Sequence, residues 1–85
     1  MQILYSARFA RQYKKLSREV KDKAEKAELI FRKDPFDKRL RTHKLSGSLK
    51  DFYSFSVTGS HRVIFDMPDK NTARFYDIGD HSVYR

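Results

Sequence analysis

The spacing of hydrophobic side chains changes along the chain and divides it into a helical part and a strand-rich part. A short apolar run at residues 2–5 predicts a first strand. Phe9, Tyr13 and Leu16 then recur at helical spacing and predict a short amphipathic helix with a basic outer face. Ser6 precedes this pattern and is a suitable N-cap, because its hydroxyl oxygen can accept a hydrogen bond from an otherwise unpaired amide.

A second helix is predicted after Ser17, which is again a suitable N-cap. Its buried stripe consists of apolar residues at helical spacing, namely Val20, Ala24, Ala27, Ile30 and Phe31. Opposite charges three or four residues apart on the exposed side add local support. Asp34-Pro35 ends the helix, because the residue before a proline is disfavoured in the helical region. We therefore expect two antiparallel helices joined by a tight turn.

The second half of the chain has the alternation that is typical of strands. Aromatic and apolar side chains there alternate with Ser54 and Ser56. Residues 58–60 predict a three-residue hairpin loop with a glycine available for a positive φ angle, and residues 61–66 form the return strand. In this pairing Arg62 lies beside Ser56, on the face opposite the apolar side chains.

The last strand is predicted at residues 73–78, after a turn that contains proline. The favoured register turns Phe75 toward the core. Arg74 and Tyr76 then lie near Arg62, although a slip of one residue would reverse the two faces.

The order of these elements predicts an α+β fold with a single domain over residues 1–85, in the order β-α-α-β-β-β. The two helices are expected to cover one face of a small, mainly antiparallel sheet and to leave the other face open. Residues 36–44, between the second helix and the hairpin, are rich in charge, and we interpret them as a solvated connection.

The net charge indicates a polyanionic partner. The chain carries 19 Lys and Arg residues against 11 Asp and Glu residues, for a formal net charge of +8 at pH 7. A field of this size attracts phosphates and favours RNA, DNA or an acidic protein as partner over a merely solvated surface. Cysteine is absent, which excludes disulfides, thiolate nucleophiles and Cys-ligated zinc. Because no apolar run approaches membrane-spanning length, we expect a cytoplasmic protein with no membrane partner.

The candidate chemistry comes from histidine, arginine and tyrosine. The three histidines are far apart and no pair has metal-ligand spacing, while Asp77, Asp80 and His81 lie close together in a way that is common by chance. We therefore expect no metal and no cofactor. The set suits metal-free RNA cleavage, because histidine can act as acid or base near neutral pH, arginine can bind phosphate, and tyrosine can stack a base.

Each candidate also has a structural alternative. His43 could bond a backbone carbonyl where the connection turns into the strand, and His61 could serve the end of the hairpin. Arg62 could pair with an acid such as Asp66 or Asp77. Taken without further information, these residues indicate a basic α+β domain that binds RNA or phosphate.

Four segments, taken in order, resemble one known family. They are the turn Leu45-Ser46-Gly47, the aromatic strand at residues 52–55, the strand at residues 61–65 and the closing residues 78–84. Over essentially its whole length the chain resembles toxins of the RelE/ParE superfamily from bacterial type II toxin–antitoxin systems. Members of the RelE, YoeB and YafQ branches are ribosome-dependent mRNA endoribonucleases, or mRNA interferases. The resemblance therefore implies this activity and a RelE-like fold. Such a toxin inhibits translation by cutting message in the decoding site and leaves a cyclic phosphate.

The resemblance also implies roles for individual residues. Arg62 matches a strand arginine that contacts the scissile phosphate in RelE-like and YoeB-like toxins. His81 falls where YoeB-like and YafQ-like toxins carry a C-terminal catalytic histidine, and His43 matches a histidine used by YafQ-like toxins. Tyr84 matches the C-terminal tyrosine of the RelE and YoeB patterns, with a shift of spacing.

Two departures from the family pattern shape the expected mechanism. RelE-like toxins place two lysines on the strand that here carries serines, and a YoeB-like glutamate base has no clear match. We therefore expect His43 and His81 to act as acid and base, in either order, with Arg62 holding phosphate. The expected RNA contacts are Lys44, Lys50, Ser54, Ser56, His61, Arg74 and Arg85.

The implied partners are a cognate antitoxin protein and the 70S ribosome with its mRNA, with no small-molecule cofactor. Two other functions stay open at this point. A ParE-like inhibitor of DNA gyrase shares the scaffold and needs no histidines. An inactive homologue would only bind the antitoxin.

Overall fold

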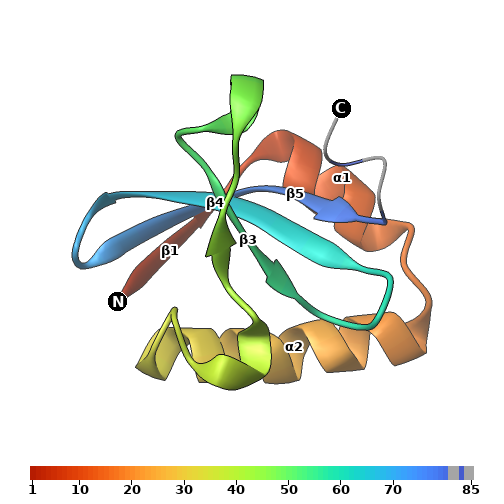
Figure 1. Ribbon diagram of the computed structural model, residues 1–85. Helices are drawn as coiled ribbons and strands as arrows, with labels where there is room; N and C mark the ends of the chain where they lie inside the picture. The colour runs from red at the N-terminus through yellow and green to blue at the C-terminus, as the bar shows by residue number, and fades with distance from the viewer. Residues whose placement is uncertain (81–82, 84–85) are drawn as a thin grey trace.

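The computed structural model describes residues 1–80 and Val83. The elements follow in the order β1 (Gln2–Tyr5), α1 (Ala7–Lys14), α2 (Arg18–Lys33), β2 (His43–Lys44), β3 (Tyr53–Ser56), β4 (Arg62–Asp69) and β5 (Thr72–Gly79). Short 3₁₀ turns at Lys38–Leu40 and Gly47–Leu49 flank β2. The predicted α+β class, with two helices ahead of a strand-rich half, is confirmed (Figure 1). Among the described residues, no helix is both long enough and apolar enough to cross a membrane.

The five strands form one mixed sheet in the order β1-β5-β4-β3-β2. β1 runs parallel to β5, and the other neighbours are antiparallel. The predicted hairpin register between β3 and β4 is confirmed, since Phe55 pairs with Val63 and Ser56 pairs with Arg62.

The connection before the hairpin contains a strand that the hydrophobic pattern did not predict. His43 and Lys44 form β2, which pairs with Ser54 and Tyr53 of β3 at the edge of the sheet. A strand of two residues is too short to show alternation, so the interpretation of this segment as a solvated connection was wrong at its end. The consequence is that His43 is fixed to the sheet by backbone pairing.

Both helices begin where the sequence predicts, and the second also ends there, whereas α1 ends at Lys14 before the predicted Leu16. The hydroxyl oxygen of Ser6 accepts a hydrogen bond from the amide of Phe9, and that of Ser17 accepts one from the amide of Val20. α2 ends at Lys33, and Asp34 adopts an extended conformation ahead of the proline.

An aromatic cluster forms the core between the helices and one face of the sheet. Phe31 of α2 is completely buried, and its ring centroid lies 5.1 Å from that of Phe55, 4.9 Å from that of Phe65 and 5.1 Å from that of Phe75. These rings belong to β3, β4 and β5, so one helical side chain joins three neighbouring strands. Tilted and edge-on contacts at these distances add to the area that the rings bury.

The register between β4 and β5 differs from the predicted one. Ile64 pairs with Asp77 and Phe65 pairs with Phe75, which leaves Tyr76 as the extra residue of a β-bulge. Arg74 therefore pairs with Asp66, so the expectation that it lies near Arg62 was wrong. A bulge depends on tertiary pairing, and an alternation of period two cannot reveal it.

The face of the sheet away from the core is called the open face below. Its residues are His43, Ser54, Ser56, Arg62, Ile64, Asp66, Arg74, Tyr76, Asp77 and Gly79. The expectation that this face is uncovered was only partly right. Ser54 and Ile64 are buried although neither belongs to the core cluster under the helices. The loop between β2 and β3 (green) rises on the side of the sheet opposite α2 (Figure 1).

Candidate functional site

His43 is held at the edge of the open face by contacts on both nitrogens of its ring. Nδ1 lies 3.2 Å from the carbonyl oxygen of Arg41, and Nε2 lies 3.4 Å from the hydroxyl oxygen of Ser54. A carbonyl oxygen can only accept, so Nδ1 carries the proton in the neutral ring. Nε2 then keeps its lone pair, and the side chain is exposed. Within the described part of the chain, the partner of Nε2 is the hydroxyl of Ser54, at the long distance of 3.4 Å. The carbonyl bond expected as the structural alternative is present, and it fixes the tautomer that a general base requires.

The backbone before His43 is unusual at Arg41, which is the left-handed residue that ends the 3₁₀ turn Lys38–Leu40. Its φ angle is 52°, a value that non-glycine residues seldom adopt. Such a residue costs free energy and persists because the surrounding structure holds it. Here it turns the chain from the buried Leu40 into β2 and aims its own carbonyl at the imidazole ring of His43.

Arg62 is the second residue of the site, and it lies where β4 begins. One terminal nitrogen of its guanidinium donates to the carbonyl oxygens of Thr58 and His61, at 2.8 and 3.1 Å. Within residues 1–80 no carboxylate forms an ion pair with it. The guanidinium is therefore oriented by neutral carbonyls and keeps its full charge for an anion.

The acids that could have neutralised Arg62 are engaged elsewhere. Asp66 receives two hydrogen bonds from Arg74, at 2.8 and 2.6 Å, and these bonds raise the pKa of the Arg74 guanidinium. Asp77 accepts a hydrogen bond of 2.8 Å from Arg8. Arg74, one of the predicted RNA contacts, is thus already paired, whereas none of the described carboxylates pairs with the predicted catalytic residue Arg62.

His61 is explained by the hairpin that it closes. Its Nδ1 lies 2.9 Å from the hydroxyl oxygen of Thr58, and its backbone amide donates to the same oxygen at 3.0 Å. Its carbonyl oxygen accepts hydrogen bonds from the amide of Val57 and from the guanidinium of Arg62. His61 therefore fixes the loop that orients Arg62.

The remaining predicted RNA contacts differ in how far their side chains are buried. Ser54 has no exposed surface and supports the ring of His43. Ser56 is half-buried on the open face beside Arg62. Lys44 and Lys50 are exposed, and Lys50 belongs to the loop that rises beside the open face.

The sheet register places His43 and Arg62 on one surface. One row of paired residues runs from His43 across Ser54 and Ile64 to Asp77, and the next row runs from Ser56 across Arg62 to Gly79. With strands about 4.8 Å apart and about 3.3 Å per residue, the Cα atoms of His43 and Arg62 lie about 12 Å apart. Two long side chains on one face can bridge that distance around a single nucleotide.

His81, Tyr84 and Arg85 lie outside the described residues. Their described neighbours Asp80 and Val83 are placed at the Arg62 end of the open face. Val83 is buried, and one of its methyl groups would lie 2.9 Å from a Cβ added to Gly79, the residue paired with Arg62. The amide of Val83 donates to the carbonyl of Asp80 at 3.1 Å.

Two aromatic side chains on this side of the sheet were not predicted as site residues. The ring of Phe52, just before β3, meets the ring of Tyr76 edge-on, with centroids 5.0 Å apart. Both side chains are half-buried, and their exposed parts offer a surface on which a base can stack. Tyr76 reaches this position because it is the extra residue of the bulge, a feature with no signal in the sequence.

A cavity of about 500 Å³ lies on the other side of the sheet and does not belong to this site. Its walls are apolar side chains of the core such as Phe9 and Val63, with Tyr5 and Glu28 at the rim. In the part of the chain that the structure describes, no group of three or more His, Cys, Asp or Glu residues could hold a metal ion.

The fold just described is that of bacterial toxins from toxin–antitoxin systems. YafQ from E. coli strain BL21(DE3) has a similar structure, with a TM-score of 0.80 and 20% identity over 98% of this chain and 96% of that chain. A YoeB/ParE toxin from Agrobacterium tumefaciens matches with a TM-score of 0.80 and 14% identity, over 95% of this chain and 99% of that chain. YafQ in the E. coli DinJ-YafQ toxin–antitoxin complex matches with a TM-score of 0.75 and 23% identity, over 96% and 93%. At these identities the likeness establishes the fold alone.

The match to a family model places the chain in one family within this class of toxins. Residues 1–84 match the model of YafQ, described as a bacterial toxin of a type II toxin–antitoxin system, and the chain belongs to this family. The comparison with curated proteins gives no significant match. The resemblance to the RelE/ParE superfamily is thereby confirmed, and the YafQ branch is the one that fits.

Proposed function

We propose that this toxin is a ribosome-dependent mRNA endoribonuclease that inhibits translation by metal-free acid–base cleavage. The observation that carries the proposal is the placement on the open face of two residues. They are a histidine whose Nε2 makes a long contact with Ser54, and an arginine with no carboxylate partner among the described residues. Membership of the YafQ family supports the same reaction.

In the proposed reaction, Nε2 of His43 removes the proton of an RNA 2′-hydroxyl, and the 2′-oxygen attacks the adjacent phosphorus. The bond between phosphorus and the 5′-oxygen breaks, which leaves a 2′,3′-cyclic phosphate and a 5′-hydroxyl end. The guanidinium of Arg62 binds the non-bridging oxygens as negative charge develops on them. The tautomer set by the Arg41 carbonyl supports His43 as the base.

The general acid in this proposal is His81, which donates a proton to the departing 5′-oxygen. The support comes from its described neighbours, since Asp80 and Val83 both lie at the end of the sheet where Gly79 pairs with Arg62. Tyr84 and Arg85 belong to the same closing segment, and we propose that they contact the message.

The message is proposed to lie along the open face with one base against Phe52 and Tyr76. Ser56 and Lys50 would contact its backbone, and Lys44 would contact ribosomal RNA. We assign buried Ser54 to holding His43 rather than to touching RNA. Because so few groups contact RNA, positioning by the ribosome supplies much of the rate, and free RNA should be cut slowly.

An antitoxin completes the proposal. The E. coli relative is seen in a DinJ-YafQ complex, and an acidic or amphipathic partner would complement the net charge of +8 here. We propose that this antitoxin keeps the toxin inactive in the cytoplasm by covering the open face or the helices.

Toeprinting on translating ribosomes tests the function. The wild-type toxin should produce a new message end at the decoding site and should leave DNA gyrase supercoiling unchanged in a parallel assay. Intact message together with inhibited supercoiling would instead support a ParE-like activity. Intact message with unaffected gyrase and normal growth would indicate an inactive homologue.

Replacing Gly79 with alanine tests the placement of the closing segment. The added Cβ would lie 2.9 Å from the Val83 methyl group, which must move, and we expect the closing segment to be displaced with it. A displacement of about 1 Å lowers catalysis about 100-fold, and we expect a loss of cleavage of that order with little change in stability. Gly59→Ala is the matched control, because a Cβ there meets nothing within 4 Å. Equal cleavage by the two variants would contradict the placement.

A further inference from the structure

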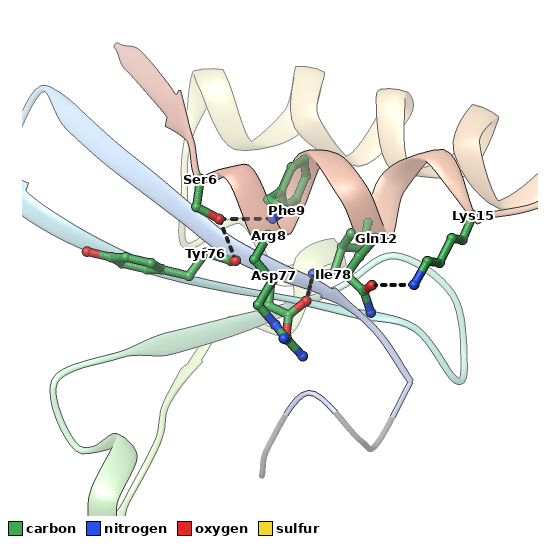
Figure 2. A network of polar contacts seen from close by, with 8 residues as sticks. All are labelled: Ser6, Arg8, Phe9, Gln12, Lys15, Tyr76, Asp77 and Ile78. Atoms are coloured by element: carbon green, nitrogen blue, oxygen red, sulfur yellow. Dashed lines mark hydrogen bonds and ion pairs between the residues drawn. The ribbon is translucent and has the colours of Figure 1, made fainter.

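Arg8 reaches the open face from a helix that otherwise packs on the other side of the sheet. It lies in the first turn of α1, and its Nε donates to the carboxylate of Asp77 on β5 at 2.8 Å. Figure 2 shows the guanidinium of Arg8 beside Asp77, next to the contacts that join the start of α1 to β5. Nothing in the hydrophobic pattern singled out Arg8, because it is one of several cations on the outer face of that helix.

The backbone beneath Arg8 is fixed to β5 by two hydrogen bonds of Ser6, which also caps α1 (Figure 2). The hydroxyl of Ser6 donates to the carbonyl of Tyr76 at 2.7 Å and accepts from the amide of Phe9 at 2.9 Å. The amide of Ser6 donates to the carbonyl of Phe75 at 3.0 Å. The first turn of α1 is therefore held against the bulge of β5, and Arg8 has a defined position relative to that strand.

The two side chains of the ion pair differ in exposure, and this difference leaves hydrogen-bond donors of Arg8 available. The side chain of Asp77 keeps only 9% of its surface exposed, and its other oxygen accepts the amide of Ile78 at 2.9 Å. The side chain of Arg8 is 61% exposed, and its bond to Asp77 uses Nε. Among the described residues no other acceptor bonds Arg8, so both terminal nitrogens of its largely exposed guanidinium keep their donors available. A planar fork of this kind suits the oxygens of a phosphate.

The register places this guanidinium in the proposed path of the message. Asp77 ends the row that begins at His43, and it lies one strand and two residues from Arg62. Strand spacing puts the Cα atoms of Asp77 and Arg62 about 8 Å apart. Arginine side chains are long, so guanidinium groups held near these two positions can reach phosphates of the same RNA strand.

We propose that Arg8 is a substrate-binding residue of this toxin, which holds the phosphate next to the one that is cleaved. Asp77 is its positioning residue, because the nearly buried carboxylate aims the guanidinium and would be left as an uncompensated charge without it. The inference rests on the proposed RNA cleavage and adds to it a second phosphate contact, contributed by α1.

The alternative is that the ion pair only fastens α1 to β5, and the double variant R8Q/D77N separates the two. It removes both charges while leaving side chains that can still hydrogen-bond, so no charge is left unpaired. The matched control is R18Q/D22N, which makes the same changes in an exposed ion pair of α2, 3.6 Å long, away from the open face. The charge-swapped variant R8D/D77R returns a guanidinium to the same place from the strand.

Cleavage of ribosome-bound message should fall about 10- to 100-fold in R8Q/D77N, as expected for the loss of one charge-assisted contact, and most of the loss should appear in KM. R18Q/D22N should cleave like the wild type, and R8D/D77R should recover most of the lost rate. Thermal unfolding should change little in R8Q/D77N. Wild-type cleavage by R8Q/D77N, or a loss in R8Q/D77N that simply follows a lowered Tm, would overturn the role of Arg8.

A second readout does not depend on cleavage. The side-chain nitrogen NMR signals of arginine can be followed while a 2′-O-methyl trinucleotide, which cannot be cleaved, is added. We expect the signals of Arg8 and Arg62 to shift while that of Arg18 does not, and an unchanged Arg8 signal would refute the contact. If the wild type leaves message intact, both the proposed function and this inference fail. If the wild type cleaves message but the NMR signal of Arg8 does not shift, this inference alone fails.

Discussion

Replacing His43 with glutamine should lower the rate of message cleavage on the ribosome about 100- to 10,000-fold, the usual contribution of a general base. Glutamine can keep a hydrogen bond to Ser54, but its amide cannot take up the proton of a 2′-hydroxyl. The fold should be retained, since the His43 side chain is exposed and its contacts are those to Arg41 and Ser54. Single-turnover cleavage, measured beside thermal unfolding, gives both quantities.

The pH dependence separates loss of a base from loss of a contact. A general base acts in its deprotonated form and a general acid in its protonated form, so the wild-type rate should rise with pH, pass through a maximum and fall again. In His43→Gln this rise should be missing. Ser54→Ala should keep it and lose much less rate, because Ser54 contacts the ring at 3.4 Å but does not itself take up the proton. A variant that still shows the rise would mean that another group is the base.

Replacing Phe31 with alanine should destabilise the protein by about 3–5 kcal/mol, the usual cost of removing a buried aromatic ring. Phe31 has no exposed surface, and it contacts the rings of Phe55, Phe65 and Phe75 on three neighbouring strands. Small domains are stabilised by only about 5–15 kcal/mol in total, so much of that margin would be lost. Urea unfolding followed by circular dichroism measures the change.

Leu29→Ala is the control for that result, because it removes an apolar side chain of α2 that is 66% exposed. Its free energy of unfolding should stay within about 0.5 kcal/mol of the wild type. Similar unfolding midpoints for the two variants would show that α2 is not joined to the sheet through Phe31.

The parts of the fold that the sequence predicts are those with local causes. Ser6 and Ser17 cap the helices because each hydroxyl lies three residues before the amide that it satisfies. The hairpin register follows from alternation on both sides of a three-residue loop. The strand at His43 and the bulge at Tyr76 arise from pairing between distant segments, and neither leaves a periodic signal.

The features of the candidate site also fall into those that the sequence predicts and those that only the structure reveals. Alternation is enough to put Arg62 on the face away from the core, beside Ser56. It cannot tell that the guanidinium is oriented by carbonyls of its own hairpin, or that Asp66 is taken by Arg74. The contact between Arg8 and Asp77 joins residues 69 positions apart, and it becomes visible only when α1 is placed on β5.

The central claim is that the open face brings His43 and Arg62 to one phosphate of the message. A structure of the toxin on a ribosome that carries a 2′-O-methyl message measures this directly. Nε2 of His43 should lie within about 3 Å of the modified 2′-oxygen, and the guanidinium of Arg62 should contact the phosphate that follows it. A message that crosses the helices instead, with the open face turned away from RNA, would contradict the account.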